Sequence, residues 1–285
     1  MDGLISVFFR ITNQWYSVLP QSRTLNRALF LSISLICALG RKTITRAISA
    51  GGKDQVDWTM FYRFFSRSPW NPRDLFNPIL KEALSLIDDD VIAIGFDDTL
   101  IKKTGKKIPG MSWQRDPSGP KFLTQFAWGA RYLQGSLLLP LYNKNNLPCR
   151  AIPVSFSQLV YIKKPSKFAP KFEHEFYAEL KQAYNSSTEF VLMLADLRKR
   201  IDELGFENKK LVAVVDGSYC NQTCFNHGLN NVTVVGRVRK NSRLYFPVSG
   251  QGKRRYSEES FTPDEIRQSN NHKYKNTKTH FAGDW

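Results

Sequence analysis

Two short runs of consecutive apolar residues stand out along the chain. Residues 91–96 and 211–215 are apolar throughout, which is typical of strands buried on both faces of a sheet. Each run is followed directly by acids, Asp97 and Asp98 after the first and Asp216 after the second. Because open α/β sheets place ligands at the carboxyl ends of their strands, we predict that these acids share one site.

Weaker patterns predict three further strands. Residues 122–132 and 136–142 predict two strands joined as a hairpin around Gly135. Residues 231–239 predict a fifth strand, and the Lys- and Pro-rich residues 163–171 predict a loop.

A helix is predicted between that loop and the second apolar run. Its apolar residues recur at helical spacing and end at a glycine: Leu194, Leu197, Ile201, Leu204 and Gly205. The predicted order of elements is that of a ribonuclease-H-like fold. It has three early strands, then a helix, then two strands that alternate with a helix. We therefore predict an α/β protein with a mixed sheet and flanking helices.

The first 85 residues have a helical and basic pattern. Residues 28–40 are apolar but too short to cross a bilayer, which favours a buried helix. Residues 42–49 and 58–66 predict two helices around a glycine turn, the second capped by Asp57. Two interpretations stay open: a DNA-reading helix-turn-helix, or a plain helical subdomain that packs three phenylalanines inward, Phe61, Phe64 and Phe65.

The charge balance indicates the kind of partner. The chain holds 41 Lys and Arg against 25 Asp and Glu, a formal net charge of +16. So basic a protein favours a polyanionic partner, nucleic acid rather than membrane. The sequence has no secretory signal pattern, so we expect a cytoplasmic protein whose cysteines are free thiols: Cys37, Cys149, Cys220 and Cys224.

The paired acids indicate the chemistry. Two neighbouring carboxylates repel each other and need a cation, and oxygen ligands suit Mg²⁺ or Mn²⁺. Such ions activate the attacking oxygen and stabilise the leaving oxygen of a phosphodiester. Taken singly, each acid could simply turn the chain after a strand. A haloacid-dehalogenase phosphatase needs a second Asp two residues after the first, but Thr99 and Leu100 stand there. Cys220, Cys224 and His227 offer only three ligands, too few for structural zinc.

Several ordered motifs resemble one protein family. Asp97-Asp98-Thr99, followed by a Lys- and Gly-rich segment at residues 102–110, is similar to the first catalytic block of bacterial insertion-sequence DDE transposases, in the subgroup with a DDT…KxGKK motif. The similarity continues through further segments: residues 151–154, 163–165, 215–221, 235–240, 244–245, 262–263 and 281–283.

The resemblance implies that Asp98 and Asp216 are the first two metal-binding and catalytic acids. The family's third ligand is a Glu on a late helix that follows a β-rich insertion. Trp285 falls inside that insertion, so we expect a C-terminally truncated copy in which cleavage and strand transfer are lost. The late acids Glu258, Glu259 and Glu265 lie in a polar segment with no apolar helical face. A non-catalytic DNA-binding fragment and a stand-alone metal-dependent nuclease are the alternatives.

The same resemblance gives an organisation and a set of DNA contacts. We expect a helical, possible DNA-binding domain at 1–85, an incomplete catalytic core at 86–241 and the start of the insertion at 242–285. The expected partners are transposon ends and target DNA in the nucleoid, and either a second copy or full-length transposase, but no membrane. The expected phosphate contacts are basic residues around the site: Lys102, Lys103, Lys106, Lys107, Arg115, Lys121, Arg131, Arg237, Arg239 and Lys240.

Overall fold

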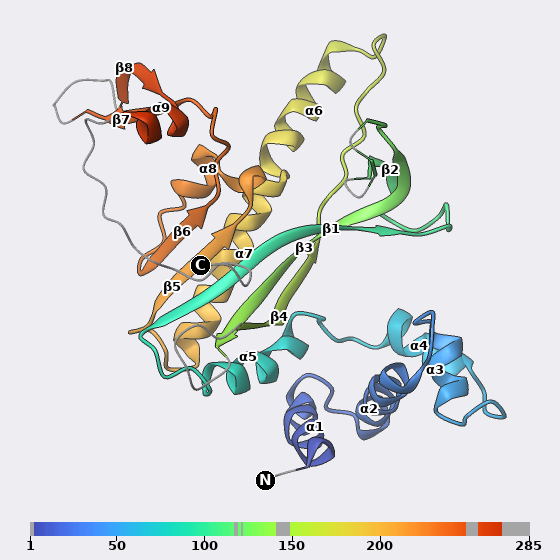
Figure 1. The fold of residues 1–285 in the computed structure, drawn as a ribbon. Helices are drawn as coiled ribbons and strands as arrows, with labels where there is room; N and C mark the ends of the chain where they lie inside the picture. The colour runs from blue at the N-terminus through green and yellow to red at the C-terminus, as the bar shows by residue number, and fades with distance from the viewer. Residues whose placement is uncertain (1–2, 117–118, 121, 141–148, 249–255, 270–285) are drawn as a thin grey trace. The chain divides into compact units, whose positions relative to one another are not determined.

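The computed structural model describes residues 3–116, 119–120, 122–140, 149–248 and 256–269, and it divides into two compact units (Figure 1). The first unit comprises residues 1–88 with 153–156, and the second comprises 89–152 and 157–285. Among the described residues, no helix combines the length and the apolar character needed to cross a bilayer.

The first unit is helical, as its pattern predicts. Its elements are α1 (Leu4–Thr12), a 3-10 turn (Asn13–Ser17), α2 (Ser22–Cys37), α3 (Ile44–Ala50), α4 (Thr59–Arg67), a 3-10 turn (Asp74–Phe76) and α5 (Asn77–Leu84). The two predicted short helices are confirmed as α3 and α4. The N-cap residue of α4 is Trp58 rather than the expected Asp57, but the Asp57 carboxylate accepts a hydrogen bond from the Thr59 N–H at 2.9 Å at the start of the helix.

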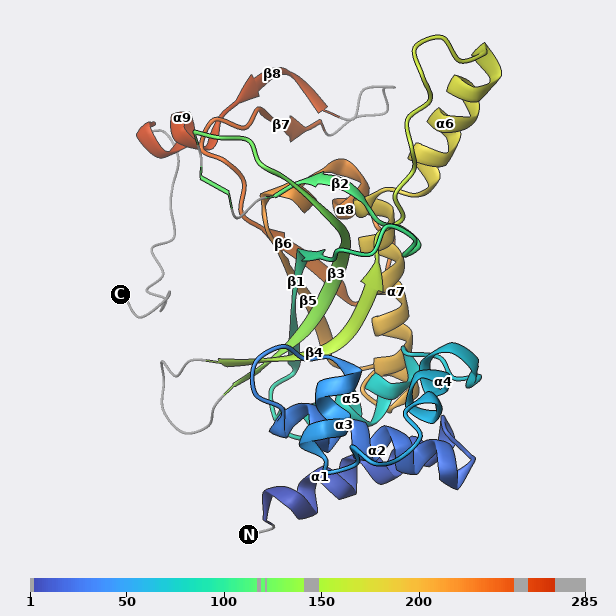
Figure 2. The ribbon, with the colours of Figure 1, turned by 90° about the vertical axis from the view of Figure 1, so that its right-hand side faces the viewer.

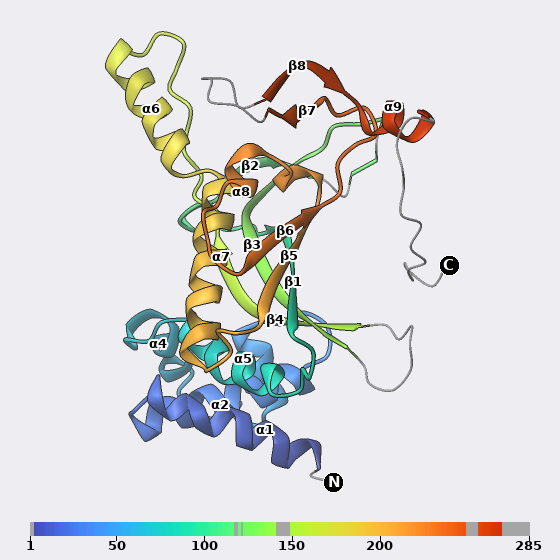
Figure 3. The ribbon, with the colours of Figure 1, turned by 90° about the vertical axis from the view of Figure 1, so that its left-hand side faces the viewer.

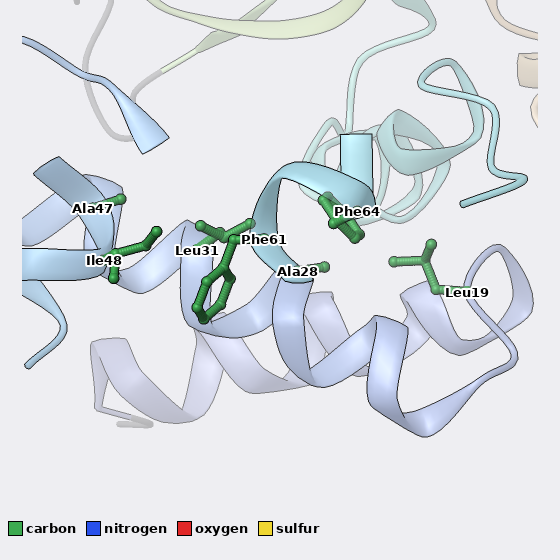
Figure 4. Close-up of a cluster of buried hydrophobic side chains, with 7 residues drawn as sticks. All are labelled: Leu19, Ala28, Leu31, Ala47, Ile48, Phe61 and Phe64. Carbon is green, nitrogen blue, oxygen red and sulfur yellow. The ribbon is translucent and has the colours of Figure 1, made fainter. Parts of the chain in front are cut away.

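A cluster of buried apolar side chains from α2, α3, α4 and the turn before α2 forms the core of this unit (Figure 4). Its members are Leu19, Ala28, Leu31, Ala47, Ile48, Phe61 and Phe64. Phe65 is 49% exposed, so the expectation that three phenylalanines pack inward is wrong for that one. The expectation that residues 28–40 are buried is also only partly right, because α2 has one buried face and Ile36 and Leu39 are exposed.

The second unit is built on a mixed sheet, which confirms the predicted fold class. The strands of this sheet are β1 (Val91–Lys102), β2 (Ser112–Arg115), β3 (Phe126–Pro140), β4 (Cys149–Gln158), β5 (Lys210–Val215) and β6 (Val232–Gly236). Residues 153–156 of β4 are grouped with the first unit. Strand β1 is antiparallel to β3 and parallel to β5, which is parallel to β6, and β3 also pairs with β2 and β4. The path β4–β3–β1–β5–β6 is a ribonuclease-H-like arrangement.

The predicted hairpin around Gly135 is wrong. Residues on both sides of Gly135 form one continuous strand, β3, in which Gly135 pairs with Phe96 of β1. A Cβ at Gly135 would lie 3.2 Å from the Phe96 ring and 3.3 Å from Leu197. This glycine therefore permits a close approach inside the core rather than a turn. The third early strand comes later, as β4.

Helices complete the second unit. The predicted helix is confirmed as α7 (Ser186–Glu203), and Gly205 follows it with φ +86°. Helix α7 runs along one face of the sheet in three views (Figures 1, 2 and 3). It buries an apolar stripe against that face: Phe190, Met193, Leu194, Leu197 and Ile201.

Two parts of this unit were not predicted as elements. Helix α6 (Lys171–Ala183) has no buried residue and projects from the end of α7 (Figure 2). After the short helix α8 (Gln222–Phe225) and strand β6, the strands β7 (Leu244–Pro247) and β8 (Tyr256–Phe261) form a separate two-stranded sheet next to α9 (Pro263–Gln268). Thr262 and Glu265 cap α9 reciprocally.

Candidate active site

The sheet register brings the predicted acids to the end of the β1–β5 pair. The last parallel pair of residues is Phe96 and Val215, and Asp216 begins the turn that follows β5. Strand β1 does not end at its acids, contrary to the prediction. It continues to Lys102 beside β3, with Asp98 opposite Leu133. Both acids therefore lie where β5 leaves the sheet and β1 loses a neighbour on that side.

Strand alternation separates the two adjacent acids of β1. The side chains of Ile94 and Phe96 are buried, and the period of two puts Asp98 on their face and Asp97 on the other. The side chain of Asp98 is 24% exposed. This supports the expectation that Asp98, rather than Asp97, directs its carboxylate over the core.

One cavity of about 590 Å³ collects the charged groups of this region. Four carboxylates and three guanidinium groups line it, from Asp97, Asp98, Asp116, Asp216, Arg115, Arg131 and Arg239. We call it the acid cavity. Asp98 and Asp216 therefore line the same cavity. Three of the basic residues expected to contact phosphate line it as well: Arg115, Arg131 and Arg239.

Each predicted metal-binding acid already has hydrogen-bond donors. Asp98 Oδ2 accepts from Arg131 Nη1 at 2.6 Å. Asp216 accepts from the Ser218 N–H at 3.0 Å and from the Ser218 hydroxyl at 3.1 Å. These contacts fix the direction of both carboxylates while leaving lone pairs on their oxygens.

Glycines let the Asp216 turn pack against the segment after β6. A Cβ at Gly217 would lie 3.2 Å from the Arg237 carbonyl oxygen. A Cβ at Gly236 would lie 2.3 Å from Cys220 Sγ and 2.9 Å from Val215 Cγ2. Any larger residue at position 236 would therefore push on the turn that carries Asp216.

Burial and the nearby carboxylates raise the pKa of two residues in this region. Burial raises the pKa of Asp97, and the charges of Asp98 and Asp216 add to that effect against an opposing hydrogen bond from the Asp98 N–H. Burial also raises the pKa of Tyr219, and the three nearby aspartates add to that shift. The Tyr219 side chain is 1% exposed, and its hydroxyl has no hydrogen-bond partner among the described residues.

The donor set fits a hard divalent cation. Carboxylate oxygens are the preferred ligands of Mg²⁺, which one or two carboxylates commonly hold together with water and substrate phosphate. Within the part of the chain that the structure describes, no three His, Cys, Asp or Glu side chains are grouped closely enough to hold a metal by themselves. Asp98 and Asp216 thus suit an ion that takes its remaining ligands from water and substrate.

The cysteine and histidine motif does not form a metal site in the described residues. Cys220 Sγ donates to the Asp216 carbonyl oxygen, Cys224 is fully buried, and His227 Nδ1 accepts from the Leu229 N–H. The expectation of free thiols is confirmed for all four cysteines.

A second cavity, of about 1000 Å³, adjoins the first. We call it the basic cavity, because five cationic side chains line it: Arg237, Arg239, Lys240, Arg243 and Arg267. It shares Asp216, Ser218 and Arg239 with the acid cavity. The two cavities therefore share part of their lining at the turn that carries Asp216.

Four other lysines expected to contact phosphate are not among the residues that line the two cavities. Lys102 forms an ion pair with Asp116 at 2.5 Å. Lys103, Lys106 and Lys107 come after the end of β1 at Lys102, and they line neither cavity. Lys121 lies outside the described residues.

The sequence patterns missed Asp116, Tyr219, Arg243 and Arg267 as members of this region. Asp116 is a buried acid just after the short strand β2, where no apolar run marks a site. Arg243 and Arg267 come from two segments that only the tertiary structure brings to one cavity. Their positive charge was the one signal available.

Comparison with known protein families identifies a related domain. Residues 14–141 match the family described as DDE superfamily endonuclease. The matched segment contains Asp98 and ends before Asp216. Comparisons with curated proteins and with solved structures gave no match. The family match supports a domain similar to those of DDE transposases and endonucleases, a class that acts on DNA with divalent metal ions.

Proposed function

We propose that this chain carries the DNA-processing site of an insertion-sequence transposase, in which Asp98 and Asp216 hold a divalent metal ion. One observation carries this proposal: the two acids come from adjacent parallel strands of a ribonuclease-H-like sheet and line one cavity with three arginines. The similarity to DDE superfamily endonucleases supports the same class of chemistry.

The bound cation would lower the pKa of the attacking oxygen and stabilise negative charge on the leaving oxygen. The chain's own residues would do the remaining work. Asp98 and Asp216 would hold the ion, and the hydrogen bonds from Ser218 would orient the Asp216 carboxylate. Arg115 and Arg239 would hold the phosphate beside it, because both line the acid cavity and a guanidinium donates hydrogen bonds to phosphate oxygens.

The basic cavity would hold the DNA backbone that leads to the acids. Arg237, Arg239 and Lys240 line it, and each offers donors to phosphate oxygens. Binding of this kind reads no sequence and falls steeply with salt. A DNA-binding protein of this charge would associate with the nucleoid.

We also propose that the described residues bind DNA but do not cleave it without a further carboxylate. Asp116 is engaged by Lys102, and within the described residues no three acids are grouped closely enough to hold a metal by themselves. The two-ion mechanism needs an additional acid to fix the second ion near the leaving oxygen. The alternative is a nuclease that completes its site with a local acid.

Nicking of supercoiled plasmid in the presence of Mn²⁺ tests both proposals. The chain should bind the plasmid and leave it supercoiled. Nicking that is lost in both Asp98→Asn and Asp216→Asn would instead support the nuclease. Absence of DNA binding at low salt would contradict the proposed function itself.

A further inference from the structure

The Arg131 guanidinium is held from three sides. Its Nη1 donates to Asp98 Oδ2 at 2.6 Å, its Nε to Gln114 Oε1 at 3.0 Å, and its Nη2 to the Arg115 carbonyl oxygen at 3.1 Å. Strands β1, β2 and β3 supply these four residues. The Arg131 side chain is 28% exposed. An arginine that serves only to bind DNA phosphate at the surface does not need hydrogen bonds to three acceptors of the protein itself.

The orientation of Gln114 is fixed as well. Its Oε1 accepts from Arg131, and its Nε2 donates to Ser112 Oγ at 3.1 Å. Ser112 is buried at the start of β2. The Gln114 amide therefore holds the Arg131 guanidinium at a fixed position relative to β2. The guanidinium in turn holds the Asp98 carboxylate. A relay of this kind aims a side chain and holds it there.

We propose that Arg131 is a positioning residue that holds the Asp98 carboxylate while no metal is bound, and that competes with the divalent cation for it. The inference rests on the proposed function, since it takes Asp98 as a cation ligand. It replaces the phosphate contact that the sequence suggested for Arg131.

Electrostatics explains why such a residue is needed. Asp97, Asp98 and Asp216 lie close enough for each to influence the others or their neighbours. Without a cation, their repulsion would drive the carboxylates apart. The Arg131 charge offsets that repulsion at Asp98 and keeps the carboxylate over the core side of β1.

The same charge opposes the incoming ion. A divalent cation on Asp98 would lie near a guanidinium that already binds one of the two carboxylate oxygens. The ion must bind the other carboxylate oxygen, share Oδ2 with the guanidinium through its remaining lone pair, or displace the guanidinium from Oδ2. Removal of the Arg131 charge should therefore strengthen cation binding, although it weakens the metal-free protein. A residue that only builds the site would show the opposite effect on binding.

Titration calorimetry with Mn²⁺ alone, on the purified full chain without DNA, tests the inference. Arg131→Gln should bind Mn²⁺ roughly 5- to 10-fold more tightly than the wild type, because one charge-assisted hydrogen bond no longer competes. Its melting temperature should fall without Mn²⁺ and rise more than that of the wild type when Mn²⁺ is added.

Two controls isolate the contact from the charge of the cavity. Arg115→Gln removes a cation from the same cavity but keeps the backbone carbonyl that Arg131 uses, so it should change the affinity less. Arg131→Lys keeps the charge but cannot make the three directional hydrogen bonds of the guanidinium, so its Mn²⁺ affinity should lie between those of the wild type and Arg131→Gln. Should Arg131→Gln not fold, Gln114→Leu removes one acceptor from the relay, and it should tighten Mn²⁺ binding in the same direction.

The outcomes separate this inference from the proposed function. Loss of Mn²⁺ binding in Asp98→Asn, together with tighter binding in Arg131→Gln or Gln114→Leu, supports both. Loss in Asp98→Asn with equal or weaker binding in folded Arg131→Gln or Gln114→Leu overturns the role of Arg131 alone. A wild type that binds no Mn²⁺, or an Asp98→Asn variant that binds it normally, overturns the cation site on which the inference rests.

Discussion

The acid cavity and the basic cavity share Arg239, yet they are built differently. The acid cavity takes Asp98 and Arg131 from neighbouring strands of the central sheet, where the register and an ion pair fix their positions. The basic cavity takes its cations from the segment after β6 and from the short helix α9. Metal binding and cleavage at one phosphodiester need side chains held at fixed positions, as the central sheet holds those of the acid cavity. Binding of a phosphate backbone needs only positive charge along a surface.

The largest effect should come from the acids themselves. Asp98→Asn and Asp216→Asn should each weaken Mn²⁺ binding by about 100-fold or more, because an amide keeps the shape but removes the charged oxygen ligand. Calorimetric titration measures this directly. Asp116→Asn is the matched control, since it alters an acid of the same cavity that Lys102 already engages. Equal losses in all three variants would mean that the cavity has no specific metal ligands.

The next effect concerns DNA. The triple variant Arg237→Gln, Arg239→Gln and Lys240→Gln should bind duplex DNA about 10- to 100-fold more weakly at low salt, and the salt slope of log Kd should fall by about one unit per residue removed. Fluorescence anisotropy at several salt concentrations gives both values. The control neutralises Lys171, Lys181 and Lys199, which line neither cavity. Matching losses in the control would contradict a localised DNA path.

A smaller effect is expected at Gly236, which packs closely against Cys220 and Val215. Gly236→Ala should lower the free energy of unfolding by about 2 kcal/mol, because the new methyl group meets Cys220 and Val215 in a packed region. It should also weaken Mn²⁺ binding, since Cys220 belongs to the turn that carries Asp216. Gly95→Ala is the control, because its Cβ would make ordinary contacts at 3.7 Å from Leu138. Urea denaturation compares the two, and equal effects would contradict the close-contact explanation.

The smallest effect is expected at Tyr219. Tyr219→Phe should raise the free energy of unfolding by about 1 kcal/mol, because a buried hydroxyl without a partner is costly. Tyr62→Phe, in contrast, removes a hydroxyl that bonds to Thr45 Oγ1 at 2.8 Å and should slightly destabilise the chain. Thermal denaturation measures both. Clear destabilisation by Tyr219→Phe would show that its hydroxyl has a partner in solution.

The sequence patterns predicted the central strands and the long helix, because those elements are buried and therefore strongly apolar. The runs at 91–96 and 211–215 correspond to β1 and β5, and the helical spacing corresponds to α7. The prediction of a hairpin around Gly135 was wrong for a physical reason. Glycine marks both turns and close contacts inside a sheet, and only the proximity of Phe96 and Leu197 distinguishes the two.

The candidate site was predictable only in part. The apolar runs indicated the acids at 97–98 and Asp216, and the resemblance to the transposase family selected Asp98 over Asp97. The ion pair between Asp98 and Arg131 could not be predicted, since it depends on how β1 and β3 pair over 33 positions of sequence separation. Helix α6 was not predicted because none of its residues is buried. Without packing against a core, its sequence does not need the strong apolar periodicity by which a helix is recognised.

Anomalous diffraction from crystals soaked in Mn²⁺ tests the central claim most directly. The account predicts one strong manganese peak about 2.2 Å from an oxygen of Asp98 and from an oxygen of Asp216, with Arg131 moved away from Asp98 Oδ2. Manganese bound through Asp97 or Asp116 instead, or no peak between Asp98 and Asp216 at saturating Mn²⁺, would contradict it.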